Sequence, residues 1–196
     1  MDKFRLPTVN QVTVLGVIKQ VEHKPSNLFS WLFYVEVPST YRNNETMLIC
    51  GTNGNGFREI VQKVVPGRDW ALINGKIRTG GFIQVREISI IPEPQLVSSG
   101  IHHVGLVGKI LSIKHLPGRV YEWQFDVDVF PEYGATEKQE VEATLTCGVG
   151  GGSITYSTEL QRSHEGQWVT VQGKIRNNGF IQVRSMVIFD VQGNSF

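Results

Sequence analysis

The chain has 196 residues, a formal net charge of +1 and 40% hydrophobic residues, which suits a globular protein of one large domain or two ordinary ones. There is no run of eighteen apolar residues, and no apolar segment follows the charged start Met1–Arg5. We therefore expect neither a membrane-spanning helix nor a secretory signal.

The first half of the chain is predicted to contain five strands and one short helix. Apolar and more polar side chains alternate from Trp31 to Val37, the pattern of a half-buried strand. The five expected strands span about residues 11–21, 29–38, 46–51, 70–78 and 81–91. Between the third and fourth strands, Phe57, Ile60, Val61 and Val64 have the spacing of an amphipathic helix.

The second half repeats the first. Gly75–Arg78 returns as Gly173–Arg176, and Gly81–Arg86 returns as Gly179–Arg184, both displaced by 98 residues. The earlier strands keep an offset of 92, so the insertions fall in loops, as expected for a duplicated domain. The segment corresponding to the helix has a weaker pattern and is predicted to be a short helix or only a turn. We place the linker in the proline-containing segment 92–100, which predicts domains 1–95 and 96–196.

The order of the elements predicts the fold. Three strands, a helix or turn, and a final hairpin form the OB-fold, a five-stranded Greek-key barrel. The sequence therefore predicts an all-β protein of two tandem OB-folds. Cys50 and Cys147 occupy equivalent strands and are each followed by glycine, so we expect buried free thiols in a reducing, cytoplasmic compartment rather than a disulfide.

Several segments resemble bacterial single-stranded DNA-binding proteins. The resemblance lies in Ile49–Gly51, Arg58–Val61, Val65–Gly67 and Ala71–Thr79, while Gln167–Gly173 is similar to the related primosomal protein B. It implies a protein that coats or protects single-stranded DNA without sequence preference in replication, recombination or repair, close to the nucleoid. It also implies a homodimer that presents four barrels, with replication or recombination proteins as further partners.

The sequence departs from this family at four features. Cys50 and Cys147 replace an aromatic residue that the family has next to the glycine at the end of the third strand. Asn44 and Val141 stand where the family has a stacking tryptophan in the third strand. The turns between the fourth and fifth strands are tight, where the family has a long loop. The residues 191–195 are uncharged, where the family has an acidic tail that recruits other proteins.

Proteins hold single strands by stacking bases on aromatic rings beside a positively charged groove. Alternation in the fourth strand places Trp70, Lys76 and Arg78 on the face opposite the apolar residues, and the fifth strand adds Phe82 and Arg86. The candidate DNA-binding residues are these five, their repeats Trp168, Lys174, Arg176, Phe180 and Arg184, and also Tyr34, Tyr41 and Arg42 on or after the second strand. The alternative for Trp70 and Trp168 is a ring that closes the end of its barrel. Trp31 and Trp123 share the parity of core phenylalanines, which favours core packing for both.

No motif indicates catalysis. The glycine-rich segment Gly148–Ser153 lacks the Lys-Ser/Thr pair of a phosphate-binding loop, and His102 and His103 have no further ligand at metal-binding spacing. We expect no enzymatic activity, no metal and no cofactor.

Two other functions stay open. One is a protein-interaction scaffold of a primosome or recombination assembly, which is favoured by the outward-facing Asp126 and Asp128 of the second half and by the near-neutral charge. The other is RNA binding, because stacking platforms do not by themselves read the 2′-hydroxyl.

Overall fold

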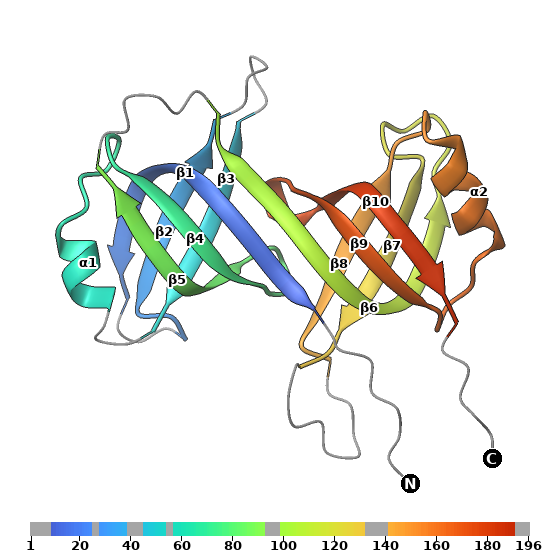
Figure 1. Cartoon of the computed structure of the whole chain (residues 1–196), viewed down its shortest axis with the longest axis horizontal. Coiled ribbons are helices and arrows are strands. Elements are labelled where there is room, and N and C mark those ends of the chain that lie inside the picture. The colour runs from blue at the N-terminus through green and yellow to red at the C-terminus, as the bar shows by residue number, and fades with distance from the viewer. Residues whose placement is uncertain are drawn as a thin grey trace, which may run out of the picture. The chain divides into compact units, whose positions relative to one another are not determined.

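The computed structural model describes residues 9–24, 28–38, 45–53, 57–92, 99–131 and 141–190. They form two compact units, one mainly of the described residues between 11 and 103 and the other mainly of those between 104 and 190, and each contains one five-stranded barrel (Figure 1). The predicted all-β class with two tandem OB-folds is confirmed. The domain boundary predicted at residues 95 and 96 falls outside the described residues and stays a prediction. Within the described part of the chain, no helix has the length and apolar character needed to cross a membrane.

The first barrel closes on itself through a parallel strand pair. Its elements are β1 (Asn10–His23), β2 (Trp31–Val37), β3 (Thr46–Thr52), α1 (Arg58–Gln62), β4 (Trp70–Ile77) and β5 (Ile83–Ile91). β1, β2 and β3 follow one another as antiparallel neighbours, β3 pairs in parallel with β5, β5 pairs with β4, and β4 returns to β1. The long β1 pairs with a strand on either side: its first half pairs with β4 and its second half pairs with β2. This is the strand order of an OB-fold.

The second barrel repeats the connections of the first. Its elements are β6 (Ile101–His115), β7 (Trp123–Val129), β8 (Ala143–Val149), α2 (Ile154–Arg162), β9 (Trp168–Ile175), the 3₁₀ turn η2 (Asn177–Gly179) and β10 (Ile181–Phe189). β8 pairs in parallel with β10, and β9 lies between β10 and β6. β1 and β6 also carry their bulges at equivalent places, after Ile18 and after Ile110. The duplication inferred from the sequence therefore extends to the detail of strand register.

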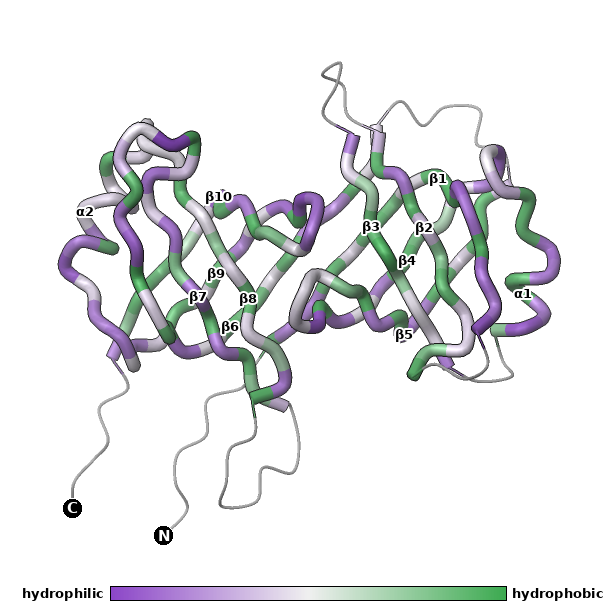
Figure 2. The backbone as a smooth tube through the Cα atoms, turned by 180° about the vertical axis from the view of Figure 1, so that it is seen from behind, coloured by the Kyte–Doolittle hydropathy of each residue, from purple (hydrophilic) through white to green (hydrophobic). Residues whose placement is uncertain are grey.

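Each core is built from the inward side chains of alternating strands. Phe33 and Val35 of β2 are fully buried, and Phe125 and Val127 of β7 are at most 1% exposed. Figure 2 shows the corresponding change between apolar and polar residues along the strands of both barrels. Cys50 and Cys147 are buried free thiols, as predicted, and burial raises the pKa of both. The outward residues of the same strands are therefore the ones available for binding.

The helices differ from the prediction in their relative strength. α1 has only five residues, with Val61 as its buried residue, whereas α2 has nine residues and buries Leu160. The second segment is therefore a short helix and not only a turn, and it is the longer of the two helices although its apolar pattern is the weaker. The apolar residues of α2 are too few to predict how it attaches to the barrel. A hydrogen bond provides part of this attachment, because the backbone N–H of Ile188 in β10 donates to Glu159 Oε1 of α2 at 3.0 Å.

Candidate nucleic-acid interface

The outer face of β2 and β3 in the first barrel carries a row of exposed and half-exposed side chains, most of them apolar. Leu32, Tyr34 and Glu36 of β2 lie on it, opposite Gly51, Ile49 and Met47 of β3 in antiparallel register. Met47 and Ile49 are each 41% exposed. We call this row, together with Phe29, Phe82 and Arg78 at its end, the first-barrel face. Strands two and three of an OB-fold form its usual oligonucleotide-binding surface.

Two phenylalanine rings stack at one end of this face. Phe29 precedes β2 and Phe82 precedes β5, and their ring centroids lie 4.6 Å apart at an interplanar angle of 23°. The Phe82 ring lies over Gly51, where a Cβ atom would come within 2.3 Å of Phe82 Cζ and within 3.0 Å of the Cβ atom of Phe29. Only glycine lets the rings lie this close to β3. The half-exposed Phe82 is thus held as a flat apolar surface on the outside of the barrel.

A guanidinium group lies beside these rings. Arg78 follows β4, and its Nε donates a hydrogen bond to Gln84 Oε1 at 2.8 Å, with a second bond from Nη2 to the same oxygen. Gln84 pairs with Gly51 in the parallel β3–β5 ladder. Arg78 therefore comes from the tip of the β4–β5 hairpin and is held next to the ring-bearing end of β3. A cation held beside stacked rings suits a chain of alternating bases and phosphates.

A histidine and a tryptophan form a second ring pair at the start of β2. His23 and Trp31 pair in the β1–β2 ladder, and their ring centroids lie 4.2 Å apart. Trp31 is half-buried, and so is Trp123, which stacks on His115 at 4.4 Å in the second barrel. The prediction of core packing for both tryptophans is wrong. They have the inward parity, but as the first residue of their strands they lie at the rim of the barrel.

The structure also corrects the exposure expected for two candidates on β4. Trp70 is 9% exposed and Lys76 is 8% exposed, so neither presents an open surface. The exposure expected for these two residues is therefore wrong. For Trp70 this leaves the alternative of a ring that closes the barrel. Arg86 is exposed at a bulge in β5, beside Asn74 and Glu87 in a pocket of about 270 Å³, away from Phe82 and Tyr34.

The second barrel keeps the ring pair over glycine. Tyr121 and Phe180 lie 4.7 Å apart between ring centroids, and a Cβ atom on Gly148 would come within 2.2 Å of Phe180 Cζ. Trp168 is half-buried, with Lys109 Nζ 5.5 Å from its ring centroid and Phe130 6.0 Å away. Lys109 therefore covers part of the ring that was expected to stack on a base.

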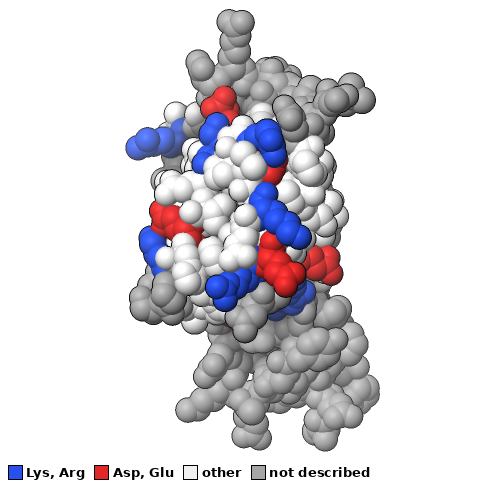
Figure 3. Space-filling model, turned by 90° about the vertical axis from the view of Figure 1, so that its left-hand side faces the viewer, with Lys and Arg blue, Asp and Glu red and all other residues white. Residues whose placement is uncertain are grey.

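The remaining predicted residues are distributed over several surfaces. Lys174 and Arg184 are exposed, and Arg176 is half-exposed. Tyr41 and Arg42 lie outside the described residues. In the view of the first barrel in Figure 3, Lys and Arg side chains alternate with Asp and Glu around uncharged surface. The positive charge there is distributed rather than continuous.

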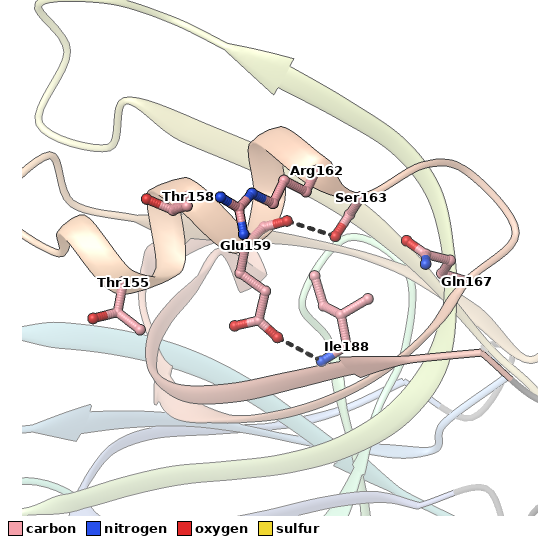
Figure 4. A pocket seen from close by; sticks show the side chains of 7 residues that line it. All are labelled: Thr155, Thr158, Glu159, Arg162, Ser163, Gln167 and Ile188. Carbon is pink, nitrogen blue, oxygen red and sulfur yellow. Dashed lines mark hydrogen bonds between the residues drawn. The ribbon is translucent and has the colours of Figure 1, made fainter.

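A pocket of about 520 Å³, lined by six polar residues and Ile188, lies between α2 and β10 of the second barrel (Figure 4). In this view Glu159 points from α2 toward Ile188, and its backbone oxygen accepts a hydrogen bond from Ser163 Oγ at 2.7 Å. The bond from Ile188 anchors α2 to the barrel and the bond from Ser163 closes the last turn of the helix, so we assign the pocket a structural role. No cluster of three or more potential metal ligands occurs among the residues that the structure describes.

Sequence reasoning missed Phe29, His23, Met47 and Ile49. Phe29 and His23 carried a signal, because Tyr121 and His115 occupy the equivalent positions 92 residues later. The pairing of Phe29 with Phe82 depends on the closure of the barrel, which brings together residues 53 positions apart.

Two closed five-stranded barrels with an outward aromatic face place the chain in the class of tandem OB-fold proteins.

Solved structures of this class are similar to the chain. The wild-type single-stranded DNA-binding protein from Thermus aquaticus matches with a TM-score of 0.64 and 9% sequence identity over 95% of either chain. A variant of that protein with a deletion and a point substitution matches with a TM-score of 0.62 and 10% identity over 96% of this chain and 98% of the other. The resemblance predicted from the sequence is therefore confirmed at the level of the fold. No protein-family model and no curated protein matches the sequence.

Proposed function

We propose that the chain binds single-stranded DNA without sequence preference through the first-barrel face. The observation that carries the proposal is the stacked pair Phe29–Phe82 over Gly51, continued by Tyr34 and Ile49 along the face, with Arg78 beside it. Each base stacked on an aromatic ring contributes about 1–3 kcal/mol, and any base offers the ring face that this requires. The fold is shared with a single-stranded DNA-binding protein from Thermus aquaticus, which supports single-stranded DNA as the ligand.

The role that fits such a binder is protection of transient single strands in replication, recombination or repair, near the nucleoid. A homodimer would present four barrels and increase affinity by linking binding sites. The scaffold alternative would use the exposed Met47 and Ile49 for protein contact instead.

Titration with oligo-dT tests the proposal. Binding should quench tryptophan fluorescence, because Trp31 is half-buried at the rim beside the face. Tyr34→Ala should raise Kd about 5- to 100-fold, the equivalent of one stacked base at roughly 1–3 kcal/mol. Tyr156→Ala is the matched control, since Tyr156 lies on α2, where its hydroxyl donates to the backbone oxygen of Arg184.

Two outcomes would contradict the proposal. Wild-type protein that leaves oligo-dT unbound at micromolar concentration favours the scaffold function. Tyr34→Ala and Tyr156→Ala variants that bind alike place the DNA on another surface. Competition between matched DNA and RNA oligomers distinguishes DNA binding from RNA binding.

A further inference from the structure

The two barrels provide an internal comparison of one surface, because equivalent residues occupy the same register positions. In the first barrel, Tyr34 of β2 lies opposite Ile49 of β3. In the second barrel, the equivalent pair is Asp126 of β7 opposite Thr146 of β8. The next pair along the strands changes from Glu36 and Met47 to Asp128 and Thr144. The centre of the face therefore differs in chemistry while the backbone is the same.

The centre of the first-barrel face offers apolar surface with little unbalanced charge. Ile49 and Met47 are each 41% exposed, and Tyr34 is half-exposed between them and β1. The one acidic residue in this row, Glu36, forms an ion pair with Lys19, whose Nζ lies 3.0 Å from Glu36 Oε2. A base can stack here, and its phosphate meets no uncompensated carboxylate in the row.

The corresponding face of the second barrel holds two carboxylates in a hydroxyl network. Asp126 accepts hydrogen bonds from Ser112 Oγ at 2.8 Å and from Thr146 Oγ1 at 2.7 Å. Asp128 accepts one from Thr144 Oγ1 at 2.6 Å. Lys114 Nζ is 3.7 Å from Asp126 and largely exposed, so water screens that contact. Between these residues and the ring pair Tyr121–Phe180 at its end, the centre of this face offers bases no aromatic ring, and its charge repels phosphate.

The charge of the two sequence halves differs in the same direction. Residues 1–95 contain 11 basic and 8 acidic residues, which gives +3, whereas residues 96–196 contain 8 basic and 10 acidic residues, which gives −2. A polyanion is therefore attracted to the first half and repelled by the second, most strongly at low salt.

We infer that the two barrels are not equivalent DNA sites: bases bind the first-barrel face, and the Asp126–Asp128 face of the second barrel excludes the strand. This inference rests on the proposed function and adds which half of the chain binds the DNA. Each chain then contributes one OB-fold's footprint, roughly 4–16 nucleotides, rather than twice that length. The ring pair Tyr121–Phe180 stays in the second barrel because it covers Gly148.

Exchange of the two central pairs between the barrels tests the inference. The variant Tyr34→Asp/Ile49→Thr gives the first barrel the residues of the second, and it should weaken oligo-dT binding at least 100-fold. The variant Asp126→Tyr/Thr146→Ile makes the reverse change, and it should increase affinity for a 30-nucleotide oligo-dT about 10-fold or more and lengthen the footprint. Asp126→Asn/Asp128→Asn removes charge without changing side-chain size, so it remains informative if the larger exchange fails to fold. It should raise affinity about 3- to 10-fold at low salt and have little effect at high salt.

The possible failures are distinguishable. Wild-type protein that does not bind oligo-dT contradicts the proposed function, and the inference fails with it. Wild-type binding that survives Tyr34→Asp/Ile49→Thr contradicts the inference alone, as does a drop in affinity after Asp126→Asn/Asp128→Asn. Circular dichroism and urea unfolding of each variant separate lost binding from lost folding.

Discussion

A single methyl group at Gly51 would test the ring platform directly. In Gly51→Ala the new Cβ would lie 2.3 Å from Phe82 Cζ, so the ring has to move outward by about 1 Å to reach ordinary van der Waals contact. Overpacking of this kind costs about 1–3 kcal/mol of unfolding free energy. The lower conformational entropy of alanine in the unfolded chain offsets about 0.4–1 kcal/mol of that. Because Phe82 is half-exposed and free to swing outward, we expect a net loss of about 1 kcal/mol.

The effect on DNA binding should be larger than the effect on stability. A displaced Phe82 no longer stacks on Phe29 and no longer offers a flat surface to a base, which removes about one stacking interaction of roughly 1–3 kcal/mol. The expected result is a 5- to 100-fold higher Kd for oligo-dT, measured by fluorescence titration beside urea unfolding. In a Phe82→Ala background, Gly51→Ala should weaken binding no further, since both changes act on one ring.

Gly148→Ala is the matched control for this prediction. Its Cβ would lie 2.2 Å from Phe180 Cζ, so its loss of stability should equal that of Gly51→Ala. Its effect on DNA binding should be absent if only the first barrel binds. Gly51→Ala protein that loses stability but keeps full affinity would refute the assignment of Phe29 and Phe82 as a base platform.

Three further outcomes are expected. Arg78→Gln should weaken binding and reduce the slope of log Kd against log salt by up to about 1, because one phosphate contact is lost; an unchanged slope removes Arg78 from the interface. The unfolding free energy should fall above about pH 9, by up to about 1.4 kcal/mol per pH unit for each thiol, because burial raises the pKa of Cys50 and the unfolded chain releases that proton first. Below pH 8 this contribution should be constant, and Cys50→Ala should show a shallower decline when both proteins are unfolded in urea across that range. Glu159→Gln should destabilise α2 by about 1 kcal/mol, seen as faster amide hydrogen exchange at Ile188, since a charged acceptor becomes neutral.

The strands and the fold followed from the sequence because they depend on local alternation and on the repeat. The predicted strand at residues 29–38 is β2 (Trp31–Val37), and the hairpin predicted at residues 70–91 is β4 and β5. Side-chain parity also held, since Phe33 and Val35 are buried while Tyr34 faces outward. A period of two in a half-buried strand encodes these features directly.

Exposure at single positions could not be read in the same way. Lys76 alternates with the apolar residues of β4 and is nevertheless only 8% exposed, because the exposure of a strand residue depends on contacts that alternation does not encode. The pairing of Phe29 with Phe82 likewise requires the closed barrel. α2 was underestimated because its anchor is the carboxylate of Glu159 rather than an apolar stripe. Each of these features depends on contacts between segments distant in sequence, which a periodic pattern does not contain.

The duplication also separates residues that build the barrel from residues that give it a ligand. Ring pairs over Gly51 and Gly148 occur in both barrels, although the second has an acidic face, so the rings have a packing role that is independent of DNA. The ring pair therefore supports base binding only together with an apolar continuation such as Tyr34 and Ile49, which the first barrel has and the second lacks. The stronger evidence is the contrast between Tyr34 and Asp126 at one register position, because the backbone tolerates either residue there and the fold alone selects neither. A difference that the fold does not require points to different ligands, and only the apolar version suits stacked bases.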